Sequence, residues 1–234
     1  RGLEYMFIMM NAARFNVGLE GLGDAEGAYQ RAVAYARDRI QGTELGVRGG
    51  PKVSILKHPD VRRMLMSMRS RIEAMRAIAY VTAAAQDKAS AHADPAVRNE
   101  MQAFVDLMIP VVKGWGTESA IDIASLGVQI HGGMGFIEET GAAQHLRDAR
   151  ITTIYEGTTA IRANDLIGRK IAREKGATIT GLIARMRADL QALEGELQPI
   201  GLRMNVALKA LERAVAWIVS EFSSKPKAVH AGSV

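Results

Sequence analysis

Residues 129–161, which read QIHGGMGFIEETGAAQHLRDARITTIYEGTTAI, decide the fold because two glycine-containing loops and an acidic residue interrupt sequence of helical character. Gly132, Gly133 and Gly135 fall within four positions near a predicted helix end. Glycine at such a place lets the backbone adopt a positive φ or approach a ligand closely. The first loop is therefore a helix C-cap followed by a turn, a ligand-facing backbone, or both.

The second loop places the carboxylate of Glu156 beside Gly157, directly before Thr158 and Thr159. A threonine here can cap the helix whose apolar pattern follows. A carboxylate next to a residue without a side chain can act as a base on a ligand, whereas a lone glutamate in a loop is normally just solvated. The residues alone leave both interpretations open.

The composition of the 234 residues favours long helices. Hydrophobic residues make up 48% of the chain and aromatic residues 5%, and proline occurs only 6 times. Alanine, methionine, leucine and arginine dominate, which suits helices far better than strands. The chain is long enough to bury a sizeable core, as one large domain or as a domain with an appendage. We predict an all-α protein.

The chain contains no cysteine, which excludes disulfides and thiolate metal sites, and no metal site is predicted. Its longest apolar runs fall well short of about 18 residues, and its start lacks a charged-then-apolar signal pattern. We therefore expect a soluble, cytoplasmic protein without a membrane segment. The chain starts at Arg1 without a methionine, as a piece cut from a longer polypeptide would.

Apolar spacing and cap residues predict the order of the helices. Pro59 and Asp94 mark helix starts, and Pro110 should kink the helix that contains it. The glycine-rich stretch 42–51 is predicted to be a loop, and residues 223–234 a frayed end. Helices are expected over residues 3–39, 58–92, 94–130, 141–149, 160–173, 179–197 and 202–222.

These helices predict a four-helix bundle with a short helical tail. Three long antiparallel helices and the helix after residue 159 form the bundle. A break at residues 176–178 separates the two parts. We predict a bundle domain over residues 1–175 and a tail domain over residues 176–234.

Three motifs within the opening stretch carry a resemblance to a known family. QIHGGMGF, RDARI and IYEGT resemble, in order and spacing, the C-terminal helical domain of the acyl-CoA dehydrogenases, flavin enzymes that desaturate acyl-CoA thioesters. The resemblance covers roughly residues 2–173, and the remaining residues resemble the tail of a subgroup with long C-terminal extensions. Each motif alone would be a weak signal, but three at matching separations are a strong one.

The resemblance implies that Glu156 is the catalytic base, which removes a proton α to the thioester carbonyl while a hydride leaves the β-carbon for the flavin. Some relatives carry the base on the first helix, at the position of Ala13 in this chain. Arg14 and Gly157 match residues that lie near the acyl-CoA. From the bare sequence, a surface cation is the favoured interpretation of Arg14, and the resemblance makes the two interpretations equal.

The resemblance also implies that FAD is the cofactor. Arg39 and His58 match family residues that contact the flavin, although Gln41 and Pro59 differ from the residues common beside them. The segment from Gln129 through Ile130, His131 and Gly132 to Gly133 is similar to the one that meets the adenine end of FAD across a subunit contact. Thr158 and Thr159 can contact the cofactor or cap the next helix.

The family uses an N-terminal helical domain and a central β-domain that this chain does not encode. We therefore expect the C-terminal part of an enzyme that oxidises an acyl-CoA to the trans-2-enoyl-CoA, with little activity as a fragment. A homodimer or homotetramer is expected, and the sequence does not identify the electron acceptor or the acyl chain.

A net charge of +5 and a pI near 9.6 suggest either an anionic ligand or nucleic acid. The alternative to the enzyme is accordingly a DNA-binding flavoprotein of the same fold, related to the alkylation-response proteins. Lysine and arginine are spread along the chain without interleaved aromatic residues. This pattern is typical of solvated helix faces, so nucleic acid is not the expected partner.

Overall fold

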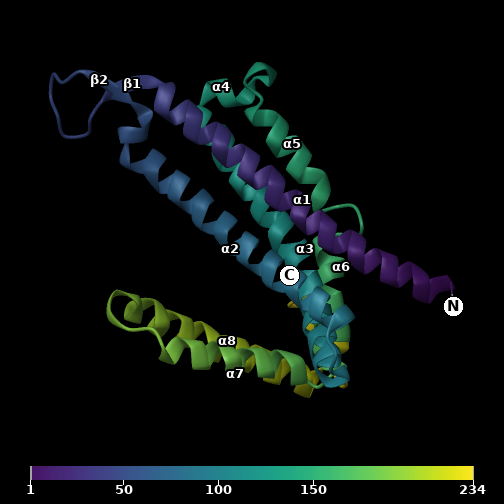
Figure 1. Cartoon of the computed structure of the whole chain (residues 1–234). Helices are drawn as coiled ribbons and strands as arrows, with labels where there is room; N and C mark the ends of the chain where they lie inside the picture. The colour runs from purple at the N-terminus through teal and green to yellow at the C-terminus, as the bar shows by residue number, and fades with distance from the viewer. Residues whose placement is uncertain (1, 234) are drawn as a thin grey trace. The chain divides into compact units, whose positions relative to one another are not determined.

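Helices make up most of the computed structural model, which describes residues 2–233 (Figure 1). This confirms the predicted all-α class. The α-helices are α1 (Gly2–Asp38), α2 (Pro59–Ala91), α3 (Pro95–His131), α4 (Gly133–Phe136), α5 (Ala142–Thr152), α6 (Thr159–Asn164), α7 (Ala177–Gln191), α8 (Gln198–Glu221) and α9 (Pro226–Ala231). Between them lie the strands β1 (Ile40–Thr43) and β2 (Lys52–Ser54), the 3-10 helices η1 (Ile55–Lys57), η2 (Glu138–Thr140) and η4 (Gly195–Leu197), and the π-helix η3 (Asp165–Ala172).

The chain forms two compact units, and each is built from two separate stretches. Unit 1 contains residues 2–84 and 111–159, and unit 2 contains residues 85–110 and 160–233. Helices α2 and α3 therefore each contribute to both units. The helix after residue 159, which the sequence assigned to the bundle, groups with the tail in unit 2. The domain boundary near residue 175 stays a prediction.

Unit 1 is built on α1, which runs alongside α5 (Figure 1). Alanines on one face of α1 are almost fully buried, and their small side chains let other helices approach closely. They pack against methionine, leucine and isoleucine side chains of α2 and against small residues of α3. The core contains Ala25, Ala28, Ala32, Ala36, Met64, Leu65, Met68, Ile72, Met75, Ala120, Ile123 and Ala124.

Helices α1 and α3 approach each other closely at Gly18. A Cβ atom added to Gly18 would lie 2.5 Å from Val112 Cγ1 and 2.9 Å from the Val112 carbonyl oxygen. Only glycine fits such a crossing. The contact fixes the part of α3 that includes Lys113 against the part of α1 that follows Arg14.

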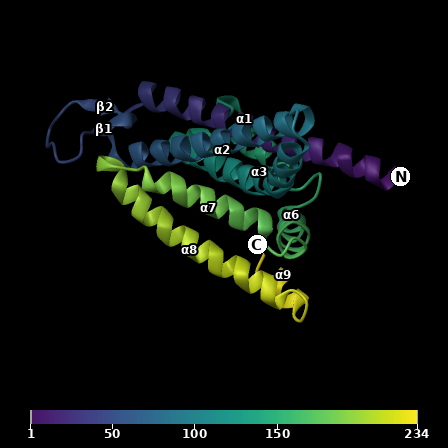
Figure 2. The same ribbon diagram turned by 60° about the horizontal axis from the view of Figure 1, so that its bottom comes forward.

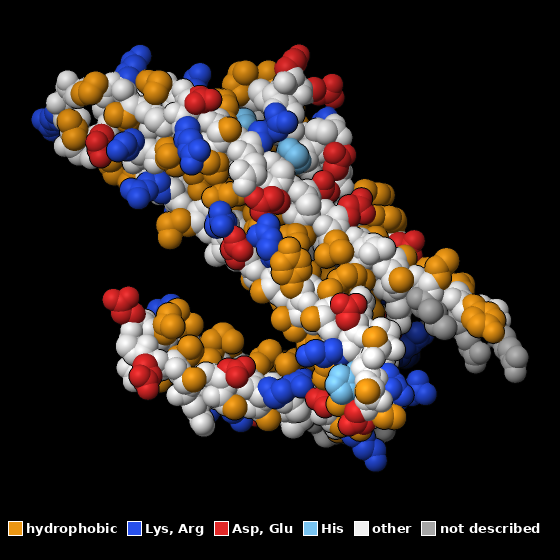
Figure 3. Space-filling model, viewed as in Figure 1, with side chains coloured by type: hydrophobic (Ala, Val, Ile, Leu, Met, Phe, Trp, Pro, Cys, Tyr) orange, Lys and Arg blue, Asp and Glu red, His pale blue; other side chains and the backbone are white. Residues whose placement is uncertain are grey.

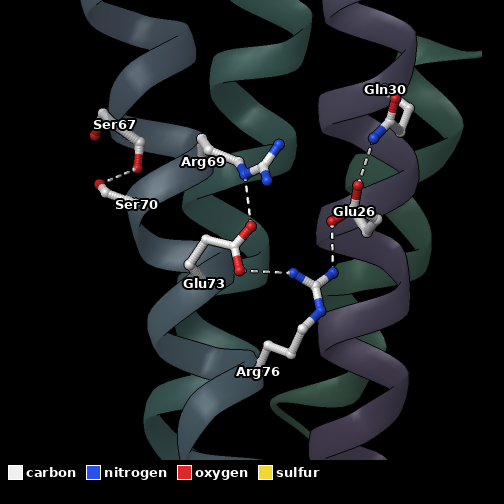
Figure 4. Close-up of polar contacts among 7 residues, drawn as sticks. All are labelled: Glu26, Gln30, Ser67, Arg69, Ser70, Glu73 and Arg76. Carbon is white, nitrogen blue, oxygen red and sulfur yellow. Dashed lines mark hydrogen bonds and ion pairs between the residues drawn. The ribbon is translucent and has the colours of Figure 1, made fainter.

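Charged side chains link α1 to α2 within unit 1 (Figure 4). Arg76 donates from Nη2 to Glu26 Oε2 at 2.8 Å and from Nη1 to Glu73 Oε2 at 3.2 Å. Arg69 Nε donates to the other oxygen of Glu73 at 2.6 Å. Hydrogen bonds from Gln30 and from Arg76 lower the pKa of Glu26 below its usual range.

Two short strands flank the predicted loop after α1, which is confirmed over residues 44–51. β1 and β2 pair antiparallel, with Ile40 opposite Ser54 and Thr43 opposite Lys52. The Ser54 hydroxyl donates to the carbonyl of Ala36 at 2.6 Å, which fastens the hairpin to the end of α1. The sequence did not indicate these strands because they are short, largely exposed and lack the alternation of apolar and polar residues that marks a strand.

The predicted helix starts are confirmed. α2 begins at Pro59, and Asp94 Oδ1 accepts from the Ala96 N–H at 2.8 Å at the start of α3. Pro110 lies inside α3 without ending it. Charged side chains of both signs are interspersed over the face shown in Figure 3. Within residues 2–233, no helix is both long and apolar enough to cross a membrane.

Unit 2 contains a helical hairpin formed by α7 and α8 (Figure 2). Its core joins apolar residues of this hairpin to the π-helix and to the end of α3 that belongs to this unit. The π-helix was not predicted from the sequence. The core contains Leu107, Ile167, Ile171, Ile179, Ile183, Leu208, Val215, Ile218 and Val229.

The frayed end predicted from residue 223 is wrong up to residue 233, because residues Pro226–Ala231 form α9. Val229 is only 1% exposed. The His230 ring lies edge-on to Phe222, with 5.5 Å between ring centroids, and its Nδ1 is 3.0 Å from Asn164 Oδ1. These contacts hold α9 against the rest of unit 2. They were not predicted, because residues 223–234 are largely polar and contain a glycine.

Candidate functional site

Glu156 lies in the turn between α5 and α6, in a backbone conformation that most residues avoid. Its φ is 56°, and that of Gly157 is 99°. For an L-residue other than glycine, a left-handed conformation costs roughly 1–2 kcal/mol. Strained residues persist only where their surroundings hold them, and they cluster at functional sites. Glu156 and Gly157 are half-buried, Thr158 is exposed and Thr159 is half-buried.

Side chains from α1 and α3 hold this turn through three hydrogen bonds. The Lys113 Nζ donates to the carbonyl oxygen of Gly157 at 2.8 Å, and the Lys113 side chain is fully buried. Thr159 donates from its hydroxyl to Glu118 on α3, which ties the end of the turn to that helix. Lys113 was not predicted from the sequence, because a lysine among apolar helical residues is usually solvated.

Tyr155 provides the third link, since its hydroxyl donates to Glu20 on α1. Burial and then this carboxylate raise the pKa of Tyr155 to about 12, so the phenol stays protonated and remains a donor. The turn is thus bound on its α1 side by Tyr155 and on its α3 side by Lys113.

Arg14 is buried, with 7% of its surface exposed, so its interpretation as a surface cation is wrong. Its Nη1 donates to Asn11 Oδ1 at 3.3 Å. Gly18, which touches Val112, lies one turn further along the same face of α1. Arg14 is therefore placed near the crossing of α1 with α3, from which Lys113 reaches the turn.

The first glycine loop follows the end of α3. Gly132 has a φ of 61°, and neither Gly132 nor Gly133 has any atom within 4 Å of the position a Cβ would take. Both residues and Gln129 are exposed. An exposed glycine backbone with open space before it fits a bulky anionic cofactor, whose phosphates could approach the N–H groups.

The last two residues of α3 turn inward instead. Ile130 and His131 are each 5% exposed. His131 Nδ1 lies 2.7 Å from the Gly127 carbonyl oxygen, and its ring stacks on Tyr35 with 4.3 Å between centroids. Burial lowers the pKa of His131; the hydrogen bond to Gly127 opposes this shift and Arg31 adds to it. The His131 imidazole therefore belongs to the packing of unit 1.

Arg39 and His58 meet at the β-hairpin. Arg39 Nη2 donates to Gln41 Oε1 at 3.2 Å, and His58 Nε2 lies 2.8 Å from the Gln41 carbonyl oxygen. The Arg39 side chain is exposed, and the His58 side chain is half-buried. Gln41 is one of the residues at which this chain departs from the resembled pattern. It contacts both Arg39 and His58, the two residues predicted to bind the cofactor.

The hairpin and the Glu156 turn are not brought together. Glu20, which binds the turn, and Asp38, which ends α1, are eighteen residues apart on one helix, roughly 27 Å along its axis. The predicted residues therefore fall into two groups along α1. One contains Arg14 and the residues from Glu156 to Thr159, and the other contains Arg39 and His58.

A cleft of about 860 Å³ lies beside the first glycine loop, between the end of α3 and α5. Its apolar part includes Phe136, which is 83% exposed. Arg147 and Arg150 add positive charge, and Glu138 lies 3.8 Å from Arg147 Nη2. Within residues 2–233, no group of three or more histidine and acidic residues could hold a metal ion.

Comparisons with known proteins agree with the resemblance seen in the motifs. A family model described as acyl-CoA dehydrogenase, C-terminal domain, matches residues 1–172. 3-Methylmercaptopropionyl-CoA dehydrogenase of Ruegeria pomeroyi is 48% identical over 100% of this chain and 40% of its own length. The broad-specificity linear acyl-CoA dehydrogenase FadE5 of Mycobacterium tuberculosis is 40% identical over 76% of this chain and 30% of its own.

Two solved structures share the fold at low sequence identity. ACDH-11 of Caenorhabditis elegans, in complex with C11-CoA, has a TM-score of 0.76 at 21% identity and covers 91% of this chain. An acyl-CoA dehydrogenase of Bacillus anthracis, complexed with FAD, has a TM-score of 0.73 at 22% identity and covers 97% of it. The chain spans 34% and 39% of these two structures and 40% or less of the two relatives above.

Proposed function

Because this chain belongs to the acyl-CoA dehydrogenase family, we propose that it is the C-terminal part of an FAD-dependent enzyme that oxidises an acyl-CoA to the trans-2-enoyl-CoA. One observation carries the proposal. Glu156 sits in a strained, half-buried turn that α1 and α3 hold in place. The FAD and the C11-CoA of the two solved structures support the choice of cofactor and substrate class.

In this proposal, Glu156 removes the proton from the carbon next to the thioester carbonyl. The α C–H bond breaks, the proton passes to the carboxylate, and the electron pair forms the new double bond as the hydride leaves the β-carbon. FAD, when bound, supplies the acceptor for that hydride. Gly157 leaves room for the thioester because it has no side chain, and the buried cation Arg14 favours a negatively charged part of the substrate.

The second group of residues would serve the cofactor. The exposed Arg39 and the half-buried His58 offer donors at the hairpin, and Gln129, Gly132 and Gly133 offer open backbone at the other loop. The hairpin and the Glu156 turn lie far apart along α1, which supports contacts of these two sites with two different flavins. We propose that the hairpin and the glycine loop reach the flavin of a neighbouring copy in a homodimer or homotetramer. The remaining flavin and acyl contacts would come from the N-terminal and β-domains.

The test is the Glu156→Gln variant of the full-length protein. Glutamine keeps the size of the side chain but cannot take the proton. We expect the anaerobic bleaching of the flavin by an acyl-CoA to slow at least about a thousandfold, in line with losses seen when an essential proton acceptor is removed. The FAD content should not change.

Glu194→Gln, on the exposed tail, is the matched control and should bleach at the wild-type rate. Bleaching of the Glu156→Gln protein at the wild-type rate would show that the base lies elsewhere. A panel of acyl-CoA thioesters in the same assay would define the acyl chain that the enzyme prefers.

A further inference from the structure

We propose that Lys113 is a positioning residue that sets the place of the Glu156 carboxylate through the backbone of the next residue; this rests on the function proposed for Glu156. The Lys113 ammonium donates to the Gly157 carbonyl at 2.8 Å. Glu156 and Gly157 share a peptide plane, so a fixed Gly157 limits where the Glu156 side chain can begin.

The burial of Lys113 calls for a specific purpose. Lysine is almost never fully buried, yet Lys113 has no exposed surface and is among the largest fully buried side chains of the described chain. Taking an ammonium group out of water costs several kcal/mol unless polar partners compensate. A methionine or leucine would fill the same space without that cost. The position holds a cation that reaches the turn.

The turn needs such a tether because its conformation is unfavourable. Positive φ angles at Glu156 and Gly157 follow one another. Without a tether, Glu156 would adopt a negative φ, and its carboxylate would move to a different position. A hydrogen bond from a charged donor is stronger than one between neutral groups, so it can offset the backbone strain at Glu156.

Lys113 is itself held firmly. Its neighbour Val112 packs against Gly18, so the helix cannot shift towards α1 at this point. The Thr117 hydroxyl donates to the Lys113 carbonyl at 2.7 Å, one turn along α3. A line of close contacts therefore runs from the crossing of α1 and α3, through Lys113, to the backbone beside Glu156.

Lys113→Met in the full-length flavoprotein tests this inference. Methionine preserves the length and the apolar stem but donates no hydrogen bond. We expect the bleaching rate at saturating acyl-CoA to fall about 10- to 100-fold, as misplacement of a reacting group by about 1 Å does. The acyl-CoA concentration for half-maximal rate should change less than about threefold, since substrate contacts remain. Lys88→Met, at an exposed lysine of α2, should behave as wild type.

A purely structural role predicts a different result. Thermal stability and FAD content would fall, but the rate for each FAD-loaded molecule would stay at the wild-type value, and that outcome overturns the inference. If Lys113→Met does not fold, Lys113→Arg decides in its place. Arginine keeps the buried charge but carries its donors on a longer, planar group, so we again expect a slower rate, and a wild-type rate in folded Lys113→Arg overturns the inference.

Glu156→Gln run in parallel separates the two proposals. Loss of bleaching in Glu156→Gln with a wild-type rate in Lys113→Met removes the role of Lys113 and leaves the base assignment standing. Wild-type bleaching in Glu156→Gln removes both.

Discussion

Gly157 serves the site with its backbone alone. Its carbonyl receives the Lys113 ammonium, and its φ of 99° lies where a side chain is strained. Glu156 is strained, and the residue that follows it is a glycine. Because glycine adopts a positive φ without strain, the backbone strain of the turn is confined to Glu156.

Gly157→Ala should therefore damage both stability and rate. We expect a loss of roughly 1–2 kcal/mol in the free energy of unfolding, from the unfavourable φ, and a bleaching rate lowered about tenfold or more as the turn relaxes. Urea unfolding and anaerobic bleaching measure the two effects. Gly181→Ala on α7 is the control, because nothing lies within 4 Å of its added Cβ and its φ is not positive; equal behaviour of the two variants would contradict the prediction.

The buried His131 and the half-buried His145 make stability depend on pH. Burial lowers the pKa of His131, and burial together with Arg31 lowers that of His145. The unfolded chain then binds more protons, so this stability is complete above an unfolded pKa of about 6.5 and is lost as pH falls through the folded values. Each histidine contributes a slope of at most about 1.4 kcal/mol per pH unit.

We expect the urea midpoint to fall between pH 7 and pH 5.5. His131→Phe should flatten this dependence, because phenylalanine can still stack on Tyr35 but does not titrate. A midpoint that stays level over this range in the wild type would refute the prediction.

At this scale, motifs in the sequence identified Glu156 and its neighbours, whose roles stay predictions. They could not identify Lys113, because nothing in a one-dimensional pattern separates a buried lysine from a solvated one. The inward turn of His131 was equally hidden. Its ring packs against Tyr35, almost a hundred residues away in the sequence.

Among the elements, the crossing of α1 and α3 determines how the site is held. Gly18 allows the two helices to touch, and its neighbours on both helices lead to Arg14 and Lys113. Such a contact depends on the absence of one methyl group. Gly18 lowers the helix propensity of α1, but the packing of α1 against α3 requires it.

Gly18→Ala should destabilise the protein by about 1–3 kcal/mol. The added carbon meets the Val112 carbonyl at 2.9 Å, which cannot move without shifting the helix, and this overpacking outweighs a propensity gain of about 0.5–1 kcal/mol. Gly23→Ala, exposed on the same helix with open space around it, should gain that amount instead. Urea midpoints that move in the same direction for both variants would contradict the proposed packing.

Helix order was predictable because the long helices carry apolar spacing and begin at proline or at a capping aspartate. The β-hairpin and the π-helix were not. The hairpin's strands are short and largely exposed, and its position depends on Ser54 reaching Ala36. The amino acids of the π-helix are equally compatible with an α-helix, so only the packing of the folded chain selects the π-helix.

On the scale of the whole molecule, the last helix belongs to the core of unit 2. Val229 on α9 is 1% exposed, and it lies near the end of the described chain. A terminal segment of six helical residues has little stability of its own. Its order therefore comes from burial of this valine and from the contact of His230 with Asn164.

Val229→Ala should cost about 1–3 kcal/mol of unfolding free energy, through lost burial and the cavity that remains. Val206→Ala removes the same two methyl groups from a valine of α8 that is 70% exposed, and should stay within about 0.5 kcal/mol of wild type. Thermal or urea unfolding distinguishes the two. Equal costs would mean that α9 is not docked in solution.

The interleaving of the two units restricts how such a protein can be recombined. A genetic crossover after codon 175 would keep residues 85–110 and 160–175 from one parent and take the tail from another. Leu107, Ile167 and Ile171 would then face partners with which they had not been selected. A chimera that preserves the native packing has to exchange both stretches of a unit at once, so viable hybrids should require paired crossovers instead of single ones.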